Sequence, residues 1–289
     1  MNNTSRHSAY VSAVLVIVLG LTACTDNPLE SDPTVSASKR RIEGNIRLSD
    51  RDHHEGVYVW LSGFDISTTS RSDGAFTMTL PSANAQTTPG GNSGVYRLYG
   101  FLGNYSIGSV TTAVRDGGFL FPSTEVDEHG NIREDIFLRE LFSITTTMSH
   151  EHLRVDSAYT LIVQVQLHST VPPVDIFFPR RIAGFEGPVL LHNLRTGAVE
   201  IHSTIITGEE ITDYVRIGEL AYNRAMLLTL PAHTLQIGEY EVIPYLLPRE
   251  NTIPHGLLES LGKDVSTLGE EYVYYPFLRN GGRLVVHPG

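Results

Sequence analysis

The sequence predicts an all-β protein: two consecutive β-sandwich domains that follow an N-terminal targeting segment and a flexible tether. From Arg41 onward, short runs of alternating apolar and polar residues are interrupted by Gly, Asp and Asn about every ten residues. No long segment has a helical period. With 289 residues, 41% of them hydrophobic, the chain is long enough for one large core or two small ones.

Charge and cysteine content exclude several classes of function. The chain carries 32 Asp+Glu against 21 Lys+Arg, a formal net charge of -11. An electrostatic footprint for nucleic acid is missing, so no nucleic-acid partner is expected. The single cysteine, Cys24, can form neither an internal disulfide nor a cysteine-based zinc site.

Residues 1–23 have the organisation of a signal peptide. A polar start with Arg6 and no acid leads into the apolar run 11–21, which is too short to span a bilayer comfortably. The run ends in Leu21-Thr-Ala-Cys24, which resembles the bacterial lipobox. The resemblance implies that residues 1–23 are removed and that Cys24 becomes a lipidated first residue. An ordinary cleaved signal followed by a chance cysteine is the alternative.

Lipidation of Cys24 implies a membrane as the first partner. Acyl chains contribute about 0.8 kcal/mol per buried CH2, and no later stretch is apolar enough to span a bilayer. Residues 24–40 are small and polar and include Pro28 and Pro33, as expected for a flexible tether. We therefore expect a lipid-anchored protein of the cell envelope, on the outer membrane, with the leaflet left open.

The first domain is expected over residues 41–141 as a sandwich of about seven strands. Residues 57–61 and 75–80 alternate in hydrophobicity, and the turn 71–74 is expected to form a hairpin whose second strand ends at Pro81. A loop over 82–94 precedes three more expected strands, over residues 95–101, 106–114 and 132–138.

The residues of this half resemble the carboxypeptidase regulatory-like domain. The resemblance rests on Glu55-Gly-Val-Tyr-Val-Trp-Leu61 followed by Ser72-Asp-Gly-Ala-Phe76. That family is a transthyretin-like β-sandwich of about a hundred residues. Its members are noncatalytic accessory modules, so the resemblance implies a scaffold rather than a reaction.

Residues 142–289 are expected to form a second sandwich. Strands are expected over 142–147 and 158–168, and Leu235-Gln-Ile-Gly-Glu-Tyr240 is similar to the tyrosine corner of immunoglobulin-like sandwiches. Residues 249–280 are expected to be an insertion with a helical turn, before a last strand over 282–287.

A hairpin is also expected over residues 188–206. With residues 195–197 as a three-residue loop, Leu194 faces Ala198 and His192 faces Glu200. The polar side chains then share one wet face of the sheet, which is either a small binding patch or ordinary solvent-exposed surface.

Catalytic and metal-binding residues are not apparent, so we expect neither an enzyme nor a cofactor. The Gly-x-Ser-x-Gly elbow of serine hydrolases, the His-Glu-x-x-His of zinc hydrolases and the Gly-x-x-x-x-Gly-Lys phosphate-binding loop are absent. Residues 50–55 begin like a calcium loop but lack its glycine and its bidentate ligand. His150 and His152 share one face of an expected strand, yet two imidazoles without a third ligand make a poor zinc site.

Aromatic residues of the insertion are the candidate ligand contacts. Tyr272, Tyr274, Tyr275 and Phe277 are hard to bury on a loop, and they suit stacking on sugar rings or anchoring of a protein. The function expected from the sequence is therefore a noncatalytic envelope lipoprotein with a structural, adhesive or protein-interaction role. The alternative is a carbohydrate-binding accessory lipoprotein of an outer-membrane uptake system.

Overall fold

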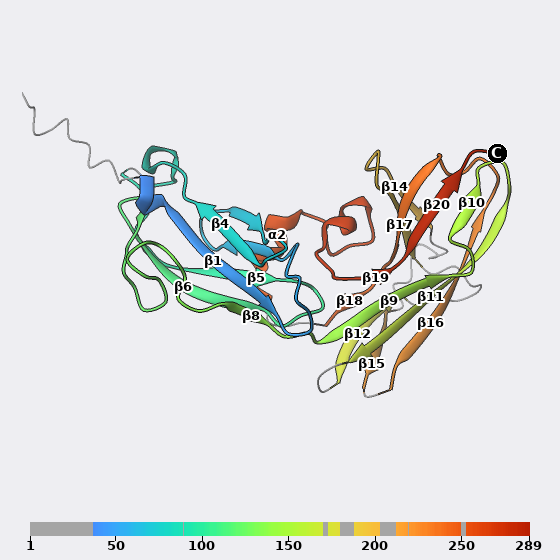
Figure 1. Ribbon diagram of the computed structural model, residues 1–289, viewed down its shortest axis with the longest axis horizontal. Helices are drawn as coiled ribbons and strands as arrows, with labels where there is room; N and C mark the ends of the chain where they lie inside the picture. The colour runs from blue at the N-terminus through green and yellow to red at the C-terminus, as the bar shows by residue number, and fades with distance from the viewer. Residues whose placement is uncertain are drawn as a thin grey trace, which may run out of the picture. The chain divides into compact units, whose positions relative to one another are not determined.

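The computed structural model describes residues 37–88, 90–169, 173–179, 188–202, 212–218, 220–249 and 253–289. The expected signal peptide, Cys24 and the tether up to residue 36 lie outside the described residues. The last residues of the expected tether form a 3-10 turn, η1 (Ala37–Arg40), directly before the first strand. The predicted all-β class is confirmed (Figure 1).

Two sheets enclose the core of the first half, residues 41–141. The order of the three-stranded sheet is β4 (Ala75–Thr79), β1 (Arg41–Leu48), β8 (Ile136–Leu138). The order of the five-stranded sheet is β3 (Ile66–Thr69), β2 (Tyr58–Leu61), β5 (Gly94–Phe101), β6 (Gly108–Arg115), β7 (Gly118–Phe119). The central strand β1 alternates buried Ile42, Ile46 and Leu48 with more exposed residues, as a half-buried strand must.

The turn at residues 71–74 forms, but the expected hairpin is wrong. β3 pairs with β2, whereas β4 pairs with β1, so the turn carries the chain from one sheet to the other. The turn is fixed at Gly74, whose φ of 84° and whose contact with Ile46 leave no room for a side chain: a Cβ would lie 2.2 Å from the Ile46 carbonyl oxygen. The Ile46 N–H also donates to the Gly74 carbonyl.

Three sheets make up the second half, residues 142–289. The five-stranded sheet has the order β10 (His152–Arg154), β20 (Arg283–His287), β17 (Gly238–Pro244), β13 (Val189–Asn193), β14 (Val199–His202). The four-stranded sheet has the order β16 (Tyr222–Leu230), β11 (Tyr159–Ser169), β9 (Phe142–Met148), β19 (Asn280–Gly281). A smaller sheet has the order β15 (Thr212–Ile217), β12 (Val174–Pro179), β18 (Leu247–Pro248). Figure 1 shows β9, β11 and β16 side by side.

Local motifs of the second half form as their residues predict. β11 buries every second residue, beginning at Leu161, and exposes those between them. The hydroxyl of buried Tyr240 donates to the Gln236 carbonyl and accepts the Gln236 N–H, at 3.0 and 2.9 Å. This is the hydrogen bonding expected of a tyrosine corner.

The register expected for the hairpin after Pro188 is wrong by one residue. His192 pairs with Val199 rather than with Glu200. The buried Asn193 is responsible, because its side-chain oxygen accepts the N–H groups of Arg195 and Thr196, each at 3.0 Å. This Asx-type cap lengthens the loop and removes the uniform polar face that the expected register implied.

Candidate functional site

The aromatic residues of the insertion are mostly buried, so the expected exposed platform is wrong for three of its four members. The exposed fractions are 0% for Tyr272, 2% for Tyr275 and 9% for Phe277, whereas Tyr274 is 65% exposed. Tyr275 and Phe277 stack with ring centroids 4.7 Å apart. These rings are buried because they do not lie on a free loop: Tyr275 and Phe277 pack against Gly103 of the first half, and Tyr272 packs against Tyr245 of the second half.

We call residues 253–280 the strap, because they connect the cores of both halves. The strap comprises helix α2 (His255–Leu261), the 3-10 turn η3 (Glu270–Tyr274) and residues 275–280, the last of which begins β19. Its rings pack in one hydrophobic cluster with Trp60 and Phe101 of the first half and with the strands of the second half. On its other side, Leu278 packs against the core of the first half.

Two residues between β5 and β6 hold the strap. The Gly103 N–H donates to the Pro276 carbonyl at 2.7 Å. The Asn104 side-chain amide donates to the carbonyls of Phe142 and Leu278, and its oxygen accepts the Leu278 N–H at 3.0 Å. Asn104 is 1% exposed, so these are desolvated hydrogen bonds whose loss would leave buried polar groups unpaired.

The other end of the strap contacts β2. The Tyr58 hydroxyl lies 3.2 Å from the Ser260 carbonyl, to which it donates, and 3.0 Å from the Ser260 hydroxyl. Gly256 of α2 faces the Trp60 ring, which lies 3.2 Å from where its Cβ would be. The strap therefore contacts the first half at two separate places.

A charged cluster lies beside these contacts. The Tyr105 hydroxyl donates to Asp50 at 2.7 Å, and Arg51 pairs with the same carboxylate at 2.6 Å. Partial burial raises the pKa of Asp50, but the hydrogen bonds from Arg51 and Tyr105 outweigh it and hold the pKa below its usual value. Burial and the bond to Asp50 raise the pKa of Tyr105 well above its usual range.

Glu140 is the destabilised member of this cluster. Its side chain is buried, and burial raises its pKa, with the Asp50 carboxylate adding to the effect. Its backbone N–H donates to the Ser49 hydroxyl at 2.9 Å, which holds it beside the Asp50 loop. The cluster thus holds one carboxylate that favours ionisation and one that resists it.

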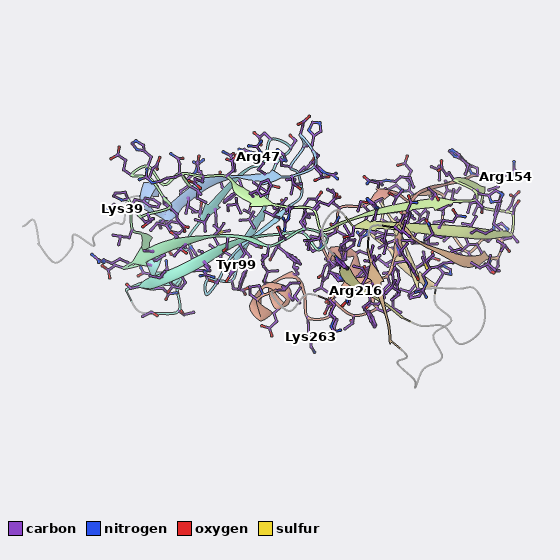
Figure 2. The ribbon with its side chains drawn as sticks, turned by 90° about the horizontal axis from the view of Figure 1, so that it is seen from below. Lys39, Arg47, Tyr99, Arg154, Arg216 and Lys263 are labelled. Atoms are coloured by element: carbon purple, nitrogen blue, oxygen red, sulfur yellow. The ribbon has the colours of Figure 1, made fainter. Side chains whose placement is uncertain are left out.

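The main cavity near this cluster is a groove on the outer face of the β4-β1-β8 sheet. Its volume is about 920 Å³, and its charged lining consists of four carboxylates and two guanidinium groups: Asp50, Asp52, Asp73, Asp135, Arg47 and Arg51. Phe137 of β8 lies directly across from Arg47 of β1 and is 52% exposed. In Figure 2, Arg47 and Tyr99 mark the two sheets of this half, the groove lying on the Arg47 side.

Several polar groups of the groove have no partner within the part of the chain that the structure describes. The side chains of Arg47, Asp52 and Asp135 are exposed and make no hydrogen bond or ion pair there, whereas those of Asp50 and Arg51 pair with each other. An exposed ring beside unpaired charges of both signs, on a rigid sheet, suits contact with a partner protein. No signal for Phe137 was apparent in the sequence, because β8 reads as an ordinary alternating strand.

The expected weak metal candidates do not assemble into larger clusters. Among the described residues no group of three or more His, Cys, Asp or Glu side chains is placed to hold a metal ion. In the 50–55 turn, Asp50 is occupied by Arg51 and Tyr105, while His54 accepts the Leu48 N–H at 3.2 Å. His150 lies outside β10, with its ring against Tyr159.

Comparison of the chain with protein-family models, with curated proteins and with solved structures gave no match. The likeness of residues 41–141 to the carboxypeptidase regulatory-like domain and of the second half to immunoglobulin-like domains therefore stays a prediction. Within the described residues, no helix has the length and apolar character needed to cross a bilayer.

The close approach at Gly103 predicts a matched pair of variants. In Gly103→Ala, the new Cβ would lie 2.4 Å from a Tyr275 ring carbon and 2.7 Å from Phe277. We expect the free energy of unfolding to fall by about 1–3 kcal/mol, because aromatic rings packed in a core cannot move away freely. In Gly269→Ala, also in the strap, no atom lies within 4 Å of the new Cβ, and we expect a change within about 0.5 kcal/mol. Denaturant unfolding measures both, and equal effects would contradict the assigned packing.

The raised pKa of Glu140 predicts a pH-dependent gain of stability in Glu140→Gln. The folded pKa lies above the usual 4.5, so the ionised carboxylate costs stability at pH values above the folded pKa. Glu140→Gln should therefore unfold at higher denaturant concentration than the native chain at about pH 7, and the gain should disappear below about pH 4.5. Glu270→Gln, on the exposed surface of η3, is the control. A gain of equal size at both pH values would argue against this explanation.

Proposed function

We propose that the chain is a noncatalytic lipoprotein of the bacterial cell envelope that acts as a protein-interaction module. The observation that carries the interaction role is the groove at Phe137, where an exposed ring lies across from Arg47, whose guanidinium has no partner among the described residues, and shares the groove with the carboxylate of Asp135. Aromatic residues and arginine are enriched among the residues that contribute most to protein interfaces. The partner is a protein whose own charges complement this mixed but predominantly acidic groove.

The groove lies on paired strands that pack on a buried core. A fixed surface of this kind favours binding over a reaction that requires a conformational change. Arg47 and Phe137 project from paired strands, and the residues alternating with them, Ile46, Ile136 and Leu138, are buried in the core beneath. The strap packs against this core and against the core of the second half. The sheet that carries the groove is therefore supported by both halves. Pre-organised side chains lose less entropy on binding.

Anchoring rests on the sequence of the first 24 residues and is part of the same proposal. The lipobox-like Leu21-Thr-Ala-Cys24 follows a signal-like apolar run, and residues 25–36 separate Cys24 from the first described element. A lipidated Cys24 would place the groove at a membrane surface, and the outer membrane is the membrane we propose. The resemblance of residues 41–141 to a noncatalytic accessory domain supports a binding role. The alternative role in carbohydrate capture relied on the exposed aromatic platform of the insertion, and the burial of three of its rings removes that support.

Anchoring is tested by metabolic labelling with radioactive palmitate in a bacterial host. The native chain should incorporate label and partition with membranes, and Cys24→Ala should do neither, because its side chain offers no sulfur for acylation. Asn27→Ala, three residues downstream, should behave like the native chain. Label that enters Cys24→Ala, or a native chain that stays unlabelled, would refute the anchor.

The groove is tested by site-specific photo-crosslinking in intact cells of the producing organism. A benzophenone side chain at position 137 should give one discrete crosslinked protein, whereas the same group at position 162, where Ile162 is 43% exposed on β11, should not. Adding Asp135→Asn to the position-137 chain should reduce the yield by about tenfold if the carboxylate contributes to the interface. Equal products from both positions, or a yield that Asp135→Asn leaves unchanged, would contradict the proposed contact surface.

A further inference from the structure

Two histidines from distant parts of the chain meet at the edge of the five-stranded sheet. His152 lies on β10 and His287 on β20, 135 residues later, and these strands pair in parallel. The Nδ1 atom of His152 lies 3.0 Å from the Nε2 atom of His287, and the two rings are nearly parallel, with centroids 5.3 Å apart. Both side chains are exposed to solvent.

The distance between the two facing nitrogens is close to the one that a metal ion requires. Zinc binds imidazole nitrogen at about 2.0–2.1 Å, and tetrahedral geometry then separates two ligand nitrogens by about 3.3 Å. The observed 3.0 Å differs from this by only a few tenths of an ångström. We propose that His152 and His287 bind a divalent transition-metal ion, with Zn²⁺ as the representative ion, through these two nitrogens.

The backbone around the pair fixes the strands that carry both ligands. The Val155 N–H donates to the His287 carbonyl at 3.0 Å, and the Val285 N–H donates to the Glu151 carbonyl at 2.8 Å. Between the two ligands' strands, Leu153 pairs with Val286, and both are buried. The strands that carry the two ligands are therefore fixed, and binding requires each ring to turn until its lone pair points at the ion instead of at the other nitrogen.

Metal binding replaces the hydrogen bond between the rings without a net change in protons. As a neutral pair, one of the facing nitrogens carries the proton and the other accepts it. For the metal to bind both, the ring that carries this proton moves it to its other nitrogen, which faces away from the ion. Both facing nitrogens then present lone pairs, and imidazole suits zinc, copper and nickel.

The site is open rather than closed. Because no third His, Cys, Asp or Glu side chain joins the pair within the described part of the chain, water or a partner's side chain completes the coordination. His150, which precedes His152 by two residues, is not a ligand: its ring lies against Tyr159 and its Nδ1 contacts the Ser149 hydroxyl at 3.1 Å. An open two-histidine site implies weak, exchangeable binding that tethers β20 to β10.

Zinc titration of the full chain, purified without an affinity tag, tests the site. Calorimetry should find one equivalent of Zn²⁺ bound saturably. His152→Ala and His287→Ala should each weaken binding by at least about tenfold, since loss of even an outer partner of a metal ligand has such an effect. His129→Ala, which removes an exposed histidine of the first half, should leave the affinity unchanged.

Nuclear magnetic resonance of the imidazole nitrogens separates binding from a purely structural role. On addition of Zn²⁺, the resonances of His152 Nδ1 and His287 Nε2 should shift together, with those of His150 unaffected. Absence of saturable binding would overturn the proposal. So would binding that survives both alanine variants, or zinc-dependent shifts at His150 in place of the pair.

Discussion

The packing of the strap rings against Gly103 is the contact on which the rest of the described fold depends. Tyr275 and Phe277 occupy the space that a side chain at position 103 would fill, and the Gly103 N–H donates to Pro276 in the same place. Through this contact the core of the second half extends to Trp60 and Phe101 of the first half, while Leu278 of the strap packs against the separate core of the first half. Burial of this kind is the main favourable term in folding, so the halves stabilise one another.

The same packing explains the hydrogen bonds and charges of several polar residues. Asn104 satisfies the backbone groups that the strap would otherwise bury unpaired, and Asp50 is stabilised by Arg51 and Tyr105. Glu140 is buried beside Asp50, and burial together with the Asp50 carboxylate raises its pKa. On the outer face of the β4-β1-β8 sheet, by contrast, Arg47 and Asp135 are exposed without a partner among the described residues, which is why the proposed interface lies there.

The sequence predicts features that depend on neighbouring residues and misses those that depend on distant ones. The alternation of β11 and the corner at Tyr240 are local, and both are confirmed. The pairing of β4 is not local, because β4 pairs with β1 rather than with the strand that precedes it. The register of the 188–202 hairpin was wrong because the Asn193 side chain caps the turn, and a loop length read from glycine alone does not include that bond.

The candidate sites illustrate the same limit. Four aromatic residues on an insertion suggest an exposed platform, because the surfaces that bury three of them are distant in sequence: Gly103 of the first half packs against Tyr275 and Phe277, and Tyr245 packs against Tyr272. His152 has His150 as a neighbour in its own segment, but its ring contacts that of His287, which only strand pairing brings beside it. No periodicity or spacing encodes such contacts, since each depends on the completed topology.

Native-state hydrogen exchange of two amides tests the central claim most directly. The N–H groups of Gly103 and Leu278 donate across the contact between the strap and the first half. If the strap joins both cores into one cooperative unit, these amides should exchange only through global unfolding, with the same denaturant dependence as amides of β11. Exchange of Gly103 and Leu278 at a much lower free energy than β11, independent of denaturant, would show that the strap opens by itself and would contradict the account.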